Sequence, residues 1–286
     1  MKSYKTPLRY PGGKSRATQF LLDKVPNNIK YYREPFIGGG SVALEFTKRN
    51  PNIPVWVNDK YKKLYHFWCE LQENGDSLYK EILKNKMRVE SYDDKESAHK
   101  ELFLKCKSDI DNLTDPFEIA VHFFIINKCS FSGLTESSGF SCTASMNNFS
   151  INNIKKLPKY SDIIKNWNIT NHSYEELLQD SSPDTFIFCD PPYDIKSGLY
   201  GKNGEHHLKF DHAKFSLDVS NVESNVMITY NSSEELKELY EGWNQVEWDL
   251  TYTMHSGESY RKDETNRKEL LLTNYKKTEG MEEFFV

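Results

Sequence analysis

The sequence predicts an α/β protein with a mostly parallel sheet and a helical segment inserted between the early and late strands. Short β-rich runs alternate with helix-compatible stretches before residue 60 and again after residue 160, which is typical of parallel sheets. Between residues 61 and 159 the chain is instead charged and helix-compatible. We therefore expect one sheet domain built from residues 1–60 and 160–286, and a helical domain at 61–159.

The elements expected in chain order follow from hydrophobic periodicity and from Gly and Pro turns. Strands are predicted at residues 29–34, 53–58, 167–173, 185–189 and 226–231, with a closing antiparallel pair at 246–254 and 269–275. Helices are predicted at residues 15–24, 41–49, 62–72, 77–86, 95–109, 115–127, 174–179 and 232–241. Residues 127–150 lack a periodic pattern and are predicted to form a loop.

Composition narrows the class of protein. With 286 residues, 37% of them hydrophobic and 14% aromatic, the chain is long enough for one sizeable domain or two small ones with a shared core. No stretch approaches the roughly 20 apolar residues of a membrane-spanning helix, and the basic start of the chain leads into polar residues, so we expect a cytoplasmic protein. Five scattered cysteines without a CxxC pair indicate free thiols and no zinc site.

The charge distribution bears on nucleic-acid binding. The formal net charge of −5 argues against it, because neutralising phosphates requires Lys and Arg. Between residues 1 and 33, however, Asp23 is the only acid against eight Lys and Arg residues. This part of the chain has enough positive charge for a local basic face, although an ordinary solvated surface accounts equally well for most of these lysines.

The strongest candidate for chemistry is the tetrapeptide Asp190-Pro191-Pro192-Tyr193, which follows the apolar strand at 185–189. Open α/β sheets bind ligands at the carboxyl ends of their strands. Because proline has no N–H, the Asp190 carboxylate and the Pro191 carbonyl would each accept a hydrogen from the exocyclic amine of a base. Tyr193 offers a flat face on which that base can stack. Taken alone, a match of four residues favours a plain turn that ends a strand.

Two glycine motifs precede this tetrapeptide. Tyr10-Pro11-Gly12-Gly13-Lys14 leads into a predicted helix, and its glycines allow a ligand to approach the backbone closely. Glu34-Pro35-Phe36-Ile37-Gly38-Gly39-Gly40 lies between a strand and a helix and fits the dinucleotide fingerprint, with Asp59 about 20 residues further on as a ribose-binding acid. The absence of a following Gly-Lys-Ser/Thr disfavours a phosphate-binding P-loop. The turn predicts an adenosine-containing cofactor without separating nicotinamide cofactors from others.

Taken together and in this order, four motifs resemble the Dam-type adenine-N6 DNA methyltransferases (D12 class, alpha group). They are Leu8–Lys14, Glu34–Ser41, Asn58-Asp59 and Asp190–Tyr193. Residues 127–134 are similar to the start of that family's recognition loop, and residues 269–275 resemble its final strand. The resemblance extends over nearly the whole chain. It implies an α/β fold with a Rossmann-like, S-adenosylmethionine-dependent methyltransferase sheet and an inserted helical target-recognition domain.

The resemblance also implies a function. A methyl group would pass from S-adenosylmethionine directly to N6 of an adenine flipped out of a specific site in double-stranded DNA, without a covalent enzyme intermediate. Residues 1–60 and 160–286 would be the two parts of the catalytic domain, and residues 61–159 would recognise the target. The protein would be prokaryotic or phage-encoded, and a cognate restriction endonuclease is a candidate partner.

Site residues follow from the resemblance position by position. Those implied at S-adenosylmethionine are Tyr10, Lys14, Phe36, Gly38, Gly40, Ser41, Asp59 and Asp190. Asp59 would bind the ribose hydroxyls, Asp190 would contact both the cofactor and the target amine, and Tyr10 stands where the family usually has Trp. Ser173 is a further candidate at the cofactor, because the turn His172-Ser173-Tyr174 lies at a predicted strand end.

The residues implied at DNA are Arg9, Asn127, Lys128, Ser130, Phe131, Ser132, Leu134 and Glu136. Phe131 and Leu134 are suited to wedging between bases, and the hydroxyl and amide groups to base edges. Glu136 falls where the GATC-reading members have an arginine, and a carboxylate cannot donate to O6 and N7 of guanine. The recognition sequence is therefore left open. A surface loop rich in Ser and Asn is equally compatible with this segment.

Other readings remain in competition. An RNA or cytosine-N4 amino methyltransferase would share the chemistry of the tetrapeptide, and a non-catalytic DNA-binding relative would keep the fold. A nicotinamide oxidoreductase leaves the tetrapeptide unexplained. The spacing of His206, His207 and His212 is not that of a metal site. These histidines indicate a polar loop near the flipped base instead. Residues 256–262 are equally compatible with a loop that contacts DNA and with a solvated turn.

Overall fold

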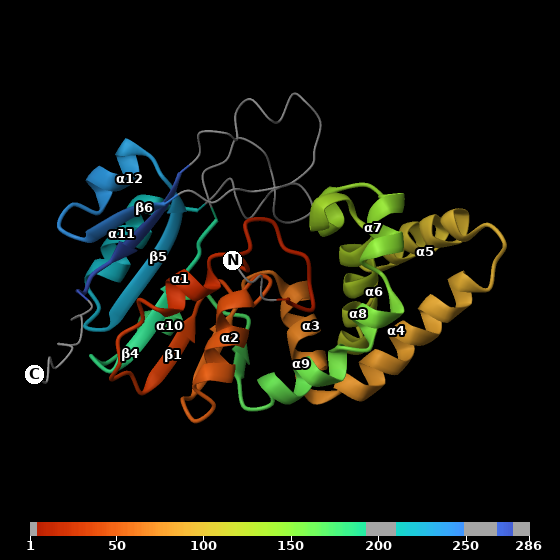
Figure 1. Cartoon of the computed structure of the whole chain (residues 1–286), viewed down its shortest axis with the longest axis horizontal. Helices are drawn as coiled ribbons and strands as arrows, with labels where there is room; N and C mark the ends of the chain where they lie inside the picture. The colour runs from red at the N-terminus through yellow and green to blue at the C-terminus, as the bar shows by residue number, and fades with distance from the viewer. Residues whose placement is uncertain (1–4, 193–209, 249–267, 277–286) are drawn as a thin grey trace, which may run out of the picture.

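The computed structural model describes residues 5–192, 210–248 and 268–276. A seven-stranded sheet lies at one end of an elongated molecule, and a group of helices lies at the other (Figure 1). The strands are β1 (Tyr31–Glu34), β2 (Val55–Asn58), β3 (Asn168–Thr170), β4 (Thr185–Cys189), β5 (Asn225–Asn231), β6 (Asn244–Trp248) and β7 (Glu269–Thr273).

The strand order β3-β2-β1-β4-β5-β7-β6 identifies the part of the sheet where a ligand is expected. β1 pairs in parallel with both β2 and β4, and β4 pairs in parallel with β5. β7 runs antiparallel to β5 and β6, which confirms the predicted closing pair, whose residues 249–254 lie outside the described chain. The order reverses between β1 and β4, and open α/β sheets bind ligands at such a switch point. The predicted α/β class with a mostly parallel, Rossmann-like sheet is confirmed.

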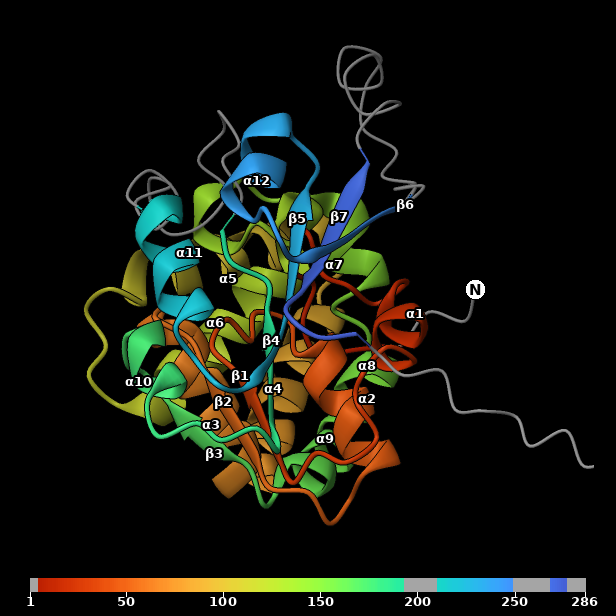
Figure 2. The same cartoon turned by 90° about the vertical axis from the view of Figure 1, so that its left-hand side faces the viewer.

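Both faces of the sheet are buried, as β4 illustrates. Phe186 and Phe188 belong to one hydrophobic cluster, and the alternating Ile187 and Cys189 belong to another. A strand covered on both faces reads as a continuous apolar run rather than as an alternation. The first cluster includes residues of α1 (Thr18–Leu22) and α2 (Ser41–Arg49), and the second includes residues of α10 (Tyr174–Leu178) and α11 (His212–Ser220). Figure 2 shows these two helix pairs on opposite sides of the strands.

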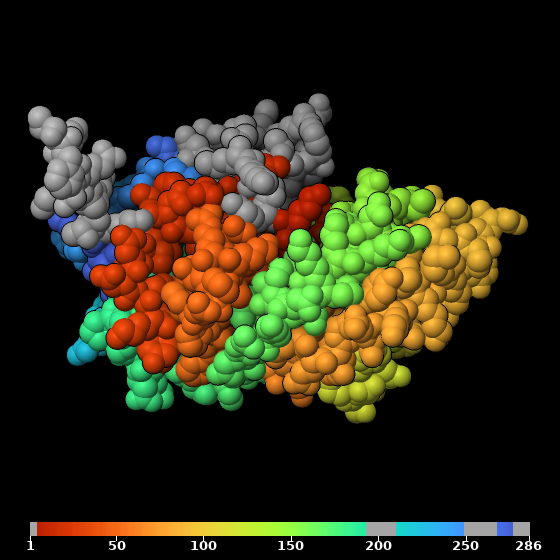
Figure 3. All heavy atoms as spheres, turned by 60° about the horizontal axis from the view of Figure 1, so that its bottom comes forward, coloured from red at the N-terminus to blue at the C-terminus, as the bar shows by residue number. Residues whose placement is uncertain are grey.

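The segment between β2 and β3 is entirely helical. It contains α3 (Lys62–Glu73), α4 (Gly75–Glu90), α5 (Lys95–Asp109), α6 (Pro116–Cys129), α7 (Cys142–Asn147), α8 (Ile151–Ile154) and α9 (Leu157–Ile164), with 3₁₀ turns at Phe131–Gly133 and Thr135–Ser137. α6 is apolar on nearly all sides and therefore lies at the centre of the segment. Its Phe123 and Phe124 share one hydrophobic cluster with Tyr32 of β1, so the helices and the sheet have a common core. Figure 3 shows the segment in yellow and green.

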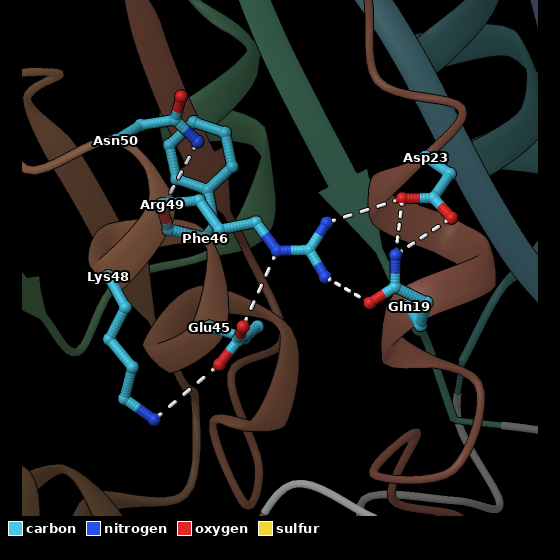
Figure 4. A network of polar contacts seen from close by, with 7 residues as sticks. All are labelled: Gln19, Asp23, Glu45, Phe46, Lys48, Arg49 and Asn50. Carbon is cyan, nitrogen blue, oxygen red and sulfur yellow. Dashed lines mark hydrogen bonds and ion pairs between the residues drawn. The ribbon is translucent and has the colours of Figure 1, made fainter. Parts of the chain in front are cut away.

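A polar network fastens α1 to α2 (Figure 4). The Arg49 guanidinium donates to Gln19 Oε1 at 2.6 Å, and its Nη1 lies 3.3 Å from Asp23 Oδ1. Within α2 the Arg49 Nε lies 3.4 Å from Glu45 Oε1. The network supplements the apolar contacts of Leu21 and Leu22 in the first cluster. The first glycine motif precedes α1 and the second precedes α2, so a connection between these helices keeps the two motifs close together.

Most predicted elements are present, and the main error concerns α7. The helix at 41–49, the helix at 95–109 and the strand at 185–189 have the predicted bounds, whereas the helix predicted at 15–24 is α-helical only at Thr18–Leu22. The loop predicted through residue 150 was wrong for Cys142–Asn147. Ser141 caps this helix by accepting a hydrogen bond from the Ala144 amide at 3.2 Å, and a cap can define a helix too short for a periodic pattern.

The remaining helix, α12 (Glu234–Leu239), follows β5 and packs Leu236 against the second cluster. Among the described helices, none has the length and apolarity needed to span a membrane.

Candidate active site

A cavity of about 510 Å³ lies at the switch point of the sheet. This volume is typical of small-molecule sites. Every described residue predicted at the cofactor or at the target amine lines it: Tyr10, Lys14, Phe36, Gly38, Gly40, Ser41, Asp59, Ser173, Asp190, Pro191 and Pro192. Tyr193 lies outside the described residues. The fold thus brings motifs that are up to 180 residues apart in the chain into one cavity.

Lys14 and Asp190 form the charged centre of this cavity. The Lys14 ammonium donates to both Asp190 carboxylate oxygens, at 2.8 and 3.0 Å, and to the Gly12 carbonyl at 2.8 Å. The side chain of Lys14 is only 1% exposed, whereas that of Asp190 is 21% exposed. A buried ammonium needs such partners, because desolvation without them is very costly. The first glycine motif therefore contributes a cation to the tetrapeptide, a contact that the sequence did not predict.

Two further side chains, missed by the sequence analysis, support this pair. Thr229 of β5 donates its hydroxyl hydrogen to Asp190 Oδ1 at 2.8 Å, and the buried Glu269 of β7 has its Oε2 4.0 Å from the Lys14 ammonium. Both lie on strands next to β4 or β5. In the sequence, the only signals for these two site residues were a Thr inside one apolar strand and a Glu at the start of another. Neither signal is specific. The carboxylate of Asp190 is thus oriented by donors from two other segments.

The glycine turn after β1 needs glycine for two physical reasons. Gly38 and Gly40 have φ angles of 48° and 68°, which side-chain-bearing residues rarely adopt. A Cβ at Gly38 would lie 2.8 Å from the Tyr10 ring, and one at Gly40 would lie 2.8 Å from the Trp68 ring. The Trp68 indole also donates to the Gly38 carbonyl at 3.1 Å. The two aromatic rings therefore hold the turn closely against the first glycine motif and α3.

Asp59 and Asn58 connect the ends of β1, β2 and β3. Asp59 Oδ2 accepts from the Gly38 amide at 3.0 Å, and Oδ1 accepts from the Tyr61 amide at 2.9 Å. Asn58 is buried and donates to the carbonyls of Pro35 and His172 at 3.1 and 3.2 Å. These bonds fix the rim of the cavity that Asp59, predicted to bind ribose, shares with Ser173.

Glu34, the first residue of the second glycine motif, is a buried acid beside the cavity. Burial raises the pKa of Glu34 well above its usual range, and the nearby Asp190 adds to this shift. The Tyr32 hydroxyl donates to Glu34 Oε2. Burial thus favours the protonated form of Glu34, which lies beside the Lys14–Asp190 pair.

Aromatic side chains form the opposite wall. The ring centroid of Phe36 lies 5.8 Å from that of Tyr174 and 5.7 Å from that of Phe210, and all three residues line the cavity. Such pairs contribute about 0.5–1.5 kcal/mol beyond their burial. The sequence analysis identified Phe36 and the turn containing Tyr174 but not Phe210. An apolar, flat-sided wall suits an aromatic ring system of a ligand.

The recognition segment, which we define as residues 127–138, is bonded to the first glycine motif. The Asn127 side-chain amide accepts from the Arg9 amide at 2.9 Å and donates to the Arg9 carbonyl at 2.7 Å. The Arg9 guanidinium donates to the Ser130 carbonyl at 3.0 Å. Asn127 and Ser130 are both fully buried. These two residues, predicted at DNA, hold the segment in place from inside the protein.

Four more predicted DNA residues differ in exposure. Phe131 is 49% exposed, and Ser132 and Leu134 are half-buried. Lys128 is buried, with its ammonium 5.4 Å from the Phe124 ring centroid, and burial lowers the pKa of Lys128 to about 7, assisted by repulsion from Arg9 and Lys156. Phe131, Ser132 and Leu134 are the members of the set that a ligand at the surface can reach.

Glu136 is also buried, and its partners belong to α3 and the turn before it. One carboxylate oxygen accepts from the Tyr61 hydroxyl, and the other forms an ion pair with Lys63 at 2.5 Å. Lys63 also pairs with Asp111 at 2.5 Å. The carboxylate that replaces a guanine-reading arginine thus joins the recognition segment to Tyr61, which lines the cavity.

The histidine-rich loop can be described only in part. His206 and His207 lie outside the described residues, as do residues 256–262. His212 begins α11, and its Nδ1 lies 3.0 Å from the Tyr230 hydroxyl. Within the described ranges, no group of three His, Cys, Asp or Glu side chains is placed to hold a metal ion.

The fold and this cavity define the class of the protein as a Rossmann-like methyltransferase. Residues 10–254 match the family model described as D12 class N6 adenine-specific DNA methyltransferase. The chain belongs to this family and is a DNA adenine-N6 methyltransferase, an enzyme whose substrate is DNA. The resemblance found in the sequence motifs is confirmed. Membership also implies dependence on S-adenosylmethionine.

Relatives of nearly the same length support this assignment. The chain is 24% identical over 289 residues to the type II methyltransferase M.MjaIII of Methanocaldococcus jannaschii, with 94% of this chain and 98% of the relative covered. It is 24% identical to M.CviBI of Paramecium bursaria Chlorella virus NC1A, with the same two coverages, and 25% identical to M1.LlaDCHI of Lactococcus lactis subsp. cremoris, with 93% and 94% covered. Each of these matches covers more than nine tenths of both chains.

Among solved structures, the chain is similar to the rRNA methyltransferase aviRa from Streptomyces viridochromogenes. The TM-score is 0.38 and the sequence identity 11%, with 93% of this chain and 86% of the other covered.

Proposed function

We propose that the cavity at the switch point binds S-adenosylmethionine beside a flipped adenine, and that Asp190, Pro191, Pro192 and Tyr193 form the catalytic corner. The observation that carries the proposal is the joining of the four motifs in one cavity, with Lys14 and Thr229 orienting the Asp190 carboxylate. Residues 61–159 are proposed as the target-recognition domain, because the recognition segment lies there and contacts Arg9.

The lining of the cavity fits this cofactor. Gly38 and Gly40 leave no space for a Cβ and bring backbone to the surface of the cavity. The aromatic wall at Phe36 suits an adenine ring, and the carboxylates of Asp59 and Asp190 suit ribose hydroxyls and a cationic group. When bound, S-adenosylmethionine supplies an electrophilic methyl group on a sulfonium. Ser41 and Ser173 add hydroxyl groups to the same lining.

The proposed role of the catalytic corner is to prepare the amine. The N6 lone pair of adenine is delocalised into the ring, so the amine is a poor nucleophile. Asp190 and the Pro191 carbonyl accept its two hydrogens and thereby localise that lone pair, and proximity supplies the remainder of the acceleration. After transfer the methylated amine is acidic and loses a proton, so no permanently ionised base is required. The role of Lys14 and Thr229 is to hold Asp190 for this task.

The DNA-facing part of the proposal uses the exposed members of the recognition segment. Phe131, Ser132 and Leu134 lie at or near the surface, next to Arg9, and are suited to displacing a base and contacting its neighbours. The buried Asn127, Lys128, Ser130 and Glu136 are proposed to act on DNA only through the shape of the segment that they support.

Nucleoside analysis tests this function. Purified chain is incubated with tritiated S-adenosylmethionine and double-stranded DNA, and the DNA is hydrolysed to nucleosides. We expect label in N6-methyl-2′-deoxyadenosine only. Label in N4-methyl-2′-deoxycytidine, or label appearing only when RNA replaces DNA, would contradict the proposal. DNA binding without any methyl transfer would identify a non-catalytic relative.

We also propose a setting for this activity. The relatives are type II methyltransferases, and a restriction endonuclease that cuts the same sequence would make this chain the protective half of a restriction–modification pair. DNA methylated by the chain should then resist that endonuclease while unmodified DNA is cut. A cytoplasmic location in a prokaryotic or phage-infected cell would give access to the chromosome.

A further inference from the structure

A second cavity lies directly beside the first. Its volume is about 560 Å³, and its lining shares Tyr10, Gly13, Gly39 and Ser41 with that of the first cavity. The rest of the lining comes from residues 6–9, from Ser15, from Phe131 and Ser132, and from α7 with the residues next to it. The methyl-transfer chemistry proposed above does not use this second cavity, and of its lining only Arg9, Phe131 and Ser132 belong to the DNA-facing part of that proposal.

The second cavity is polar but has almost no charge. Its lining contains one charged side chain, Arg9, whose guanidinium already donates to the Ser130 carbonyl. The other polar lining groups are hydroxyls and amides, from Ser, Thr and Asn. Lys and Arg are needed to neutralise phosphates, whereas amides and hydroxyls hydrogen-bond to the edges of bases as well as to phosphates. The chemistry of this lining therefore fits bases better than the DNA backbone.

Four of these groups come from α7 and the residues directly beside it, namely Ser141, Thr143, Asn147 and Asn148. Thr143 and Asn147 are four residues apart and so lie on the same side of the helix, with Asn148 directly after it. The side chains of Thr143, Asn147 and Asn148 make no hydrogen bond to any described residue. This distinguishes them from Asn127, whose amide bonds to both the Arg9 amide and the Arg9 carbonyl. The amides beside the second cavity remain available for a ligand.

The opposite wall is rigid and strained. Ser132 and Thr135 have φ angles of 52° and 54°, and Gly133 between them has 75°. Such backbone costs about 1–3 kcal/mol per non-glycine residue and persists where surrounding bonds enforce it. Here the Ser130 hydroxyl accepts from the Thr135 amide at 3.2 Å. Ser132 is therefore presented to the second cavity by a preformed turn rather than by a flexible loop.

We propose that the second cavity holds the base pairs next to the flipped adenine, and that Asn147 and Asn148 read an adenine of the recognition sequence there. Shared lining places whatever occupies this cavity next to the contents of the first. A side-chain amide carries the donor and acceptor that match N7 and the N6 amine of adenine in the major groove. This inference rests on the proposed function, because it concerns the DNA of that reaction.

The test compares the methylated sequences produced by the wild-type protein and four variants. Asn147→Ala and Asn148→Ala remove one reading amide each, and Asn147→Asp keeps the size but cannot donate to N7. Asn152→Ala is the matched control, because Asn152 is exposed on α8 and does not line the cavity. Each protein methylates the same genomic DNA, and sequencing with modified-base detection gives the sequence context of every N6-methyladenine.

The wild-type protein and Asn152→Ala should give one shared motif. Asn147→Ala, Asn147→Asp and Asn148→Ala should methylate sites that differ from this motif at one position, with discrimination there reduced about 5- to 150-fold. Affinity for S-adenosylmethionine and the melting temperature should be unchanged, which separates misreading from misfolding.

Failures of the two proposals are distinguishable. If the wild-type protein produces N6-methyladenine and all three cavity variants retain its motif and rate, the reading role of Asn147 and Asn148 is wrong and the proposed function stands. If the wild-type protein produces no N6-methyladenine, the proposed function fails and this inference fails with it. A motif relaxed equally by Asn152→Ala would also contradict the inference.

Discussion

The two neighbouring cavities differ in whether their central polar side chains are hydrogen-bonded inside the protein. In the first, Lys14, Asp190 and Thr229 are bonded to one another and buried or half-buried. In the second, the side chains of Asn147 and Asn148 hydrogen-bond to no described residue. Groups that take part in chemistry must be held in one geometry before the substrate arrives, whereas groups that read a sequence gain most when DNA is their partner. Substitutions in the first cavity should therefore affect rate and stability, and those in the second should affect sequence choice.

The largest expected effect is on methyl transfer by Asp190→Ala. Loss of the acceptor that localises the N6 lone pair should lower the single-turnover rate by at least about 100-fold, by analogy with the removal of other transition-state groups. Affinity for S-adenosylmethionine, measured by calorimetry, should weaken only modestly. Pro191→Ala retains the backbone carbonyl, so its single-turnover rate should fall less than that of Asp190→Ala. A wild-type rate for Asp190→Ala would end the assignment of this corner as catalytic.

Lys14→Met should have the largest effect on stability. It leaves Asp190 and Glu269 without the ammonium between them, and removing one partner of a buried ion pair costs about 3–5 kcal/mol. Chemical denaturation measures the free energy of unfolding. Lys60→Met is the control, because Lys60 lines the same cavity but is exposed, and its effect should stay within about 0.5 kcal/mol. Equal stability of the two variants would contradict a structural role for the Lys14 contacts.

A pair of Asn→Ala substitutions sharpens the comparison within the recognition region. Asn127→Ala leaves the Arg9 backbone groups without buried partners, which should lower the free energy of unfolding by about 1–3 kcal/mol. Asn147→Ala removes no internal bond and should change it by less than about 0.5 kcal/mol. Thermal unfolding of both variants checks this. If the two destabilise the protein equally, the distinction between supporting and reading amides is lost.

A further effect concerns pH and Lys128. The pKa of Lys128 in the folded protein is about 7, below its value of about 10.4 in an unfolded chain, because burial and the nearby Arg9 and Lys156 disfavour the charged form. Between these values the unfolded state binds more protons, so this group makes stability rise with pH from about 7 to 10. Lys128→Met removes the dependence.

Melting temperatures of wild type and Lys128→Met across this pH range measure the effect. The melting temperature of the wild type should rise relative to that of Lys128→Met as the pH increases above 7. A constant difference from pH 6 to 10 would show that Lys128 does not titrate in this window.

The extent to which sequence predicts this molecule depends on how local the signal is. The run at 185–189 identified β4 because both of its faces are buried and every residue is apolar or nearly so. The glycine turn was identifiable because Gly38 and Gly40 have backbone angles that few other residues adopt. Asp190 could be placed in the site from the strand that precedes it.

Other parts depend on contacts between distant segments, which no local pattern records. Thr229 is 39 residues from Asp190, and Glu269 is 255 residues from Lys14, yet both pairs meet across the sheet. The polar character of residues 127–138 suggested base contacts, but burial of Asn127 and Glu136 is decided by packing against α3 and the first glycine motif. α7 is too short for periodicity to detect, although the second cavity depends on it.

Calorimetric titration of the purified chain with S-adenosylmethionine tests the central claim most directly. Because the four motifs form one cavity around the Lys14–Asp190 pair, the account predicts saturable binding of one molecule per chain in the absence of DNA. A complete lack of binding at millimolar cofactor would contradict it.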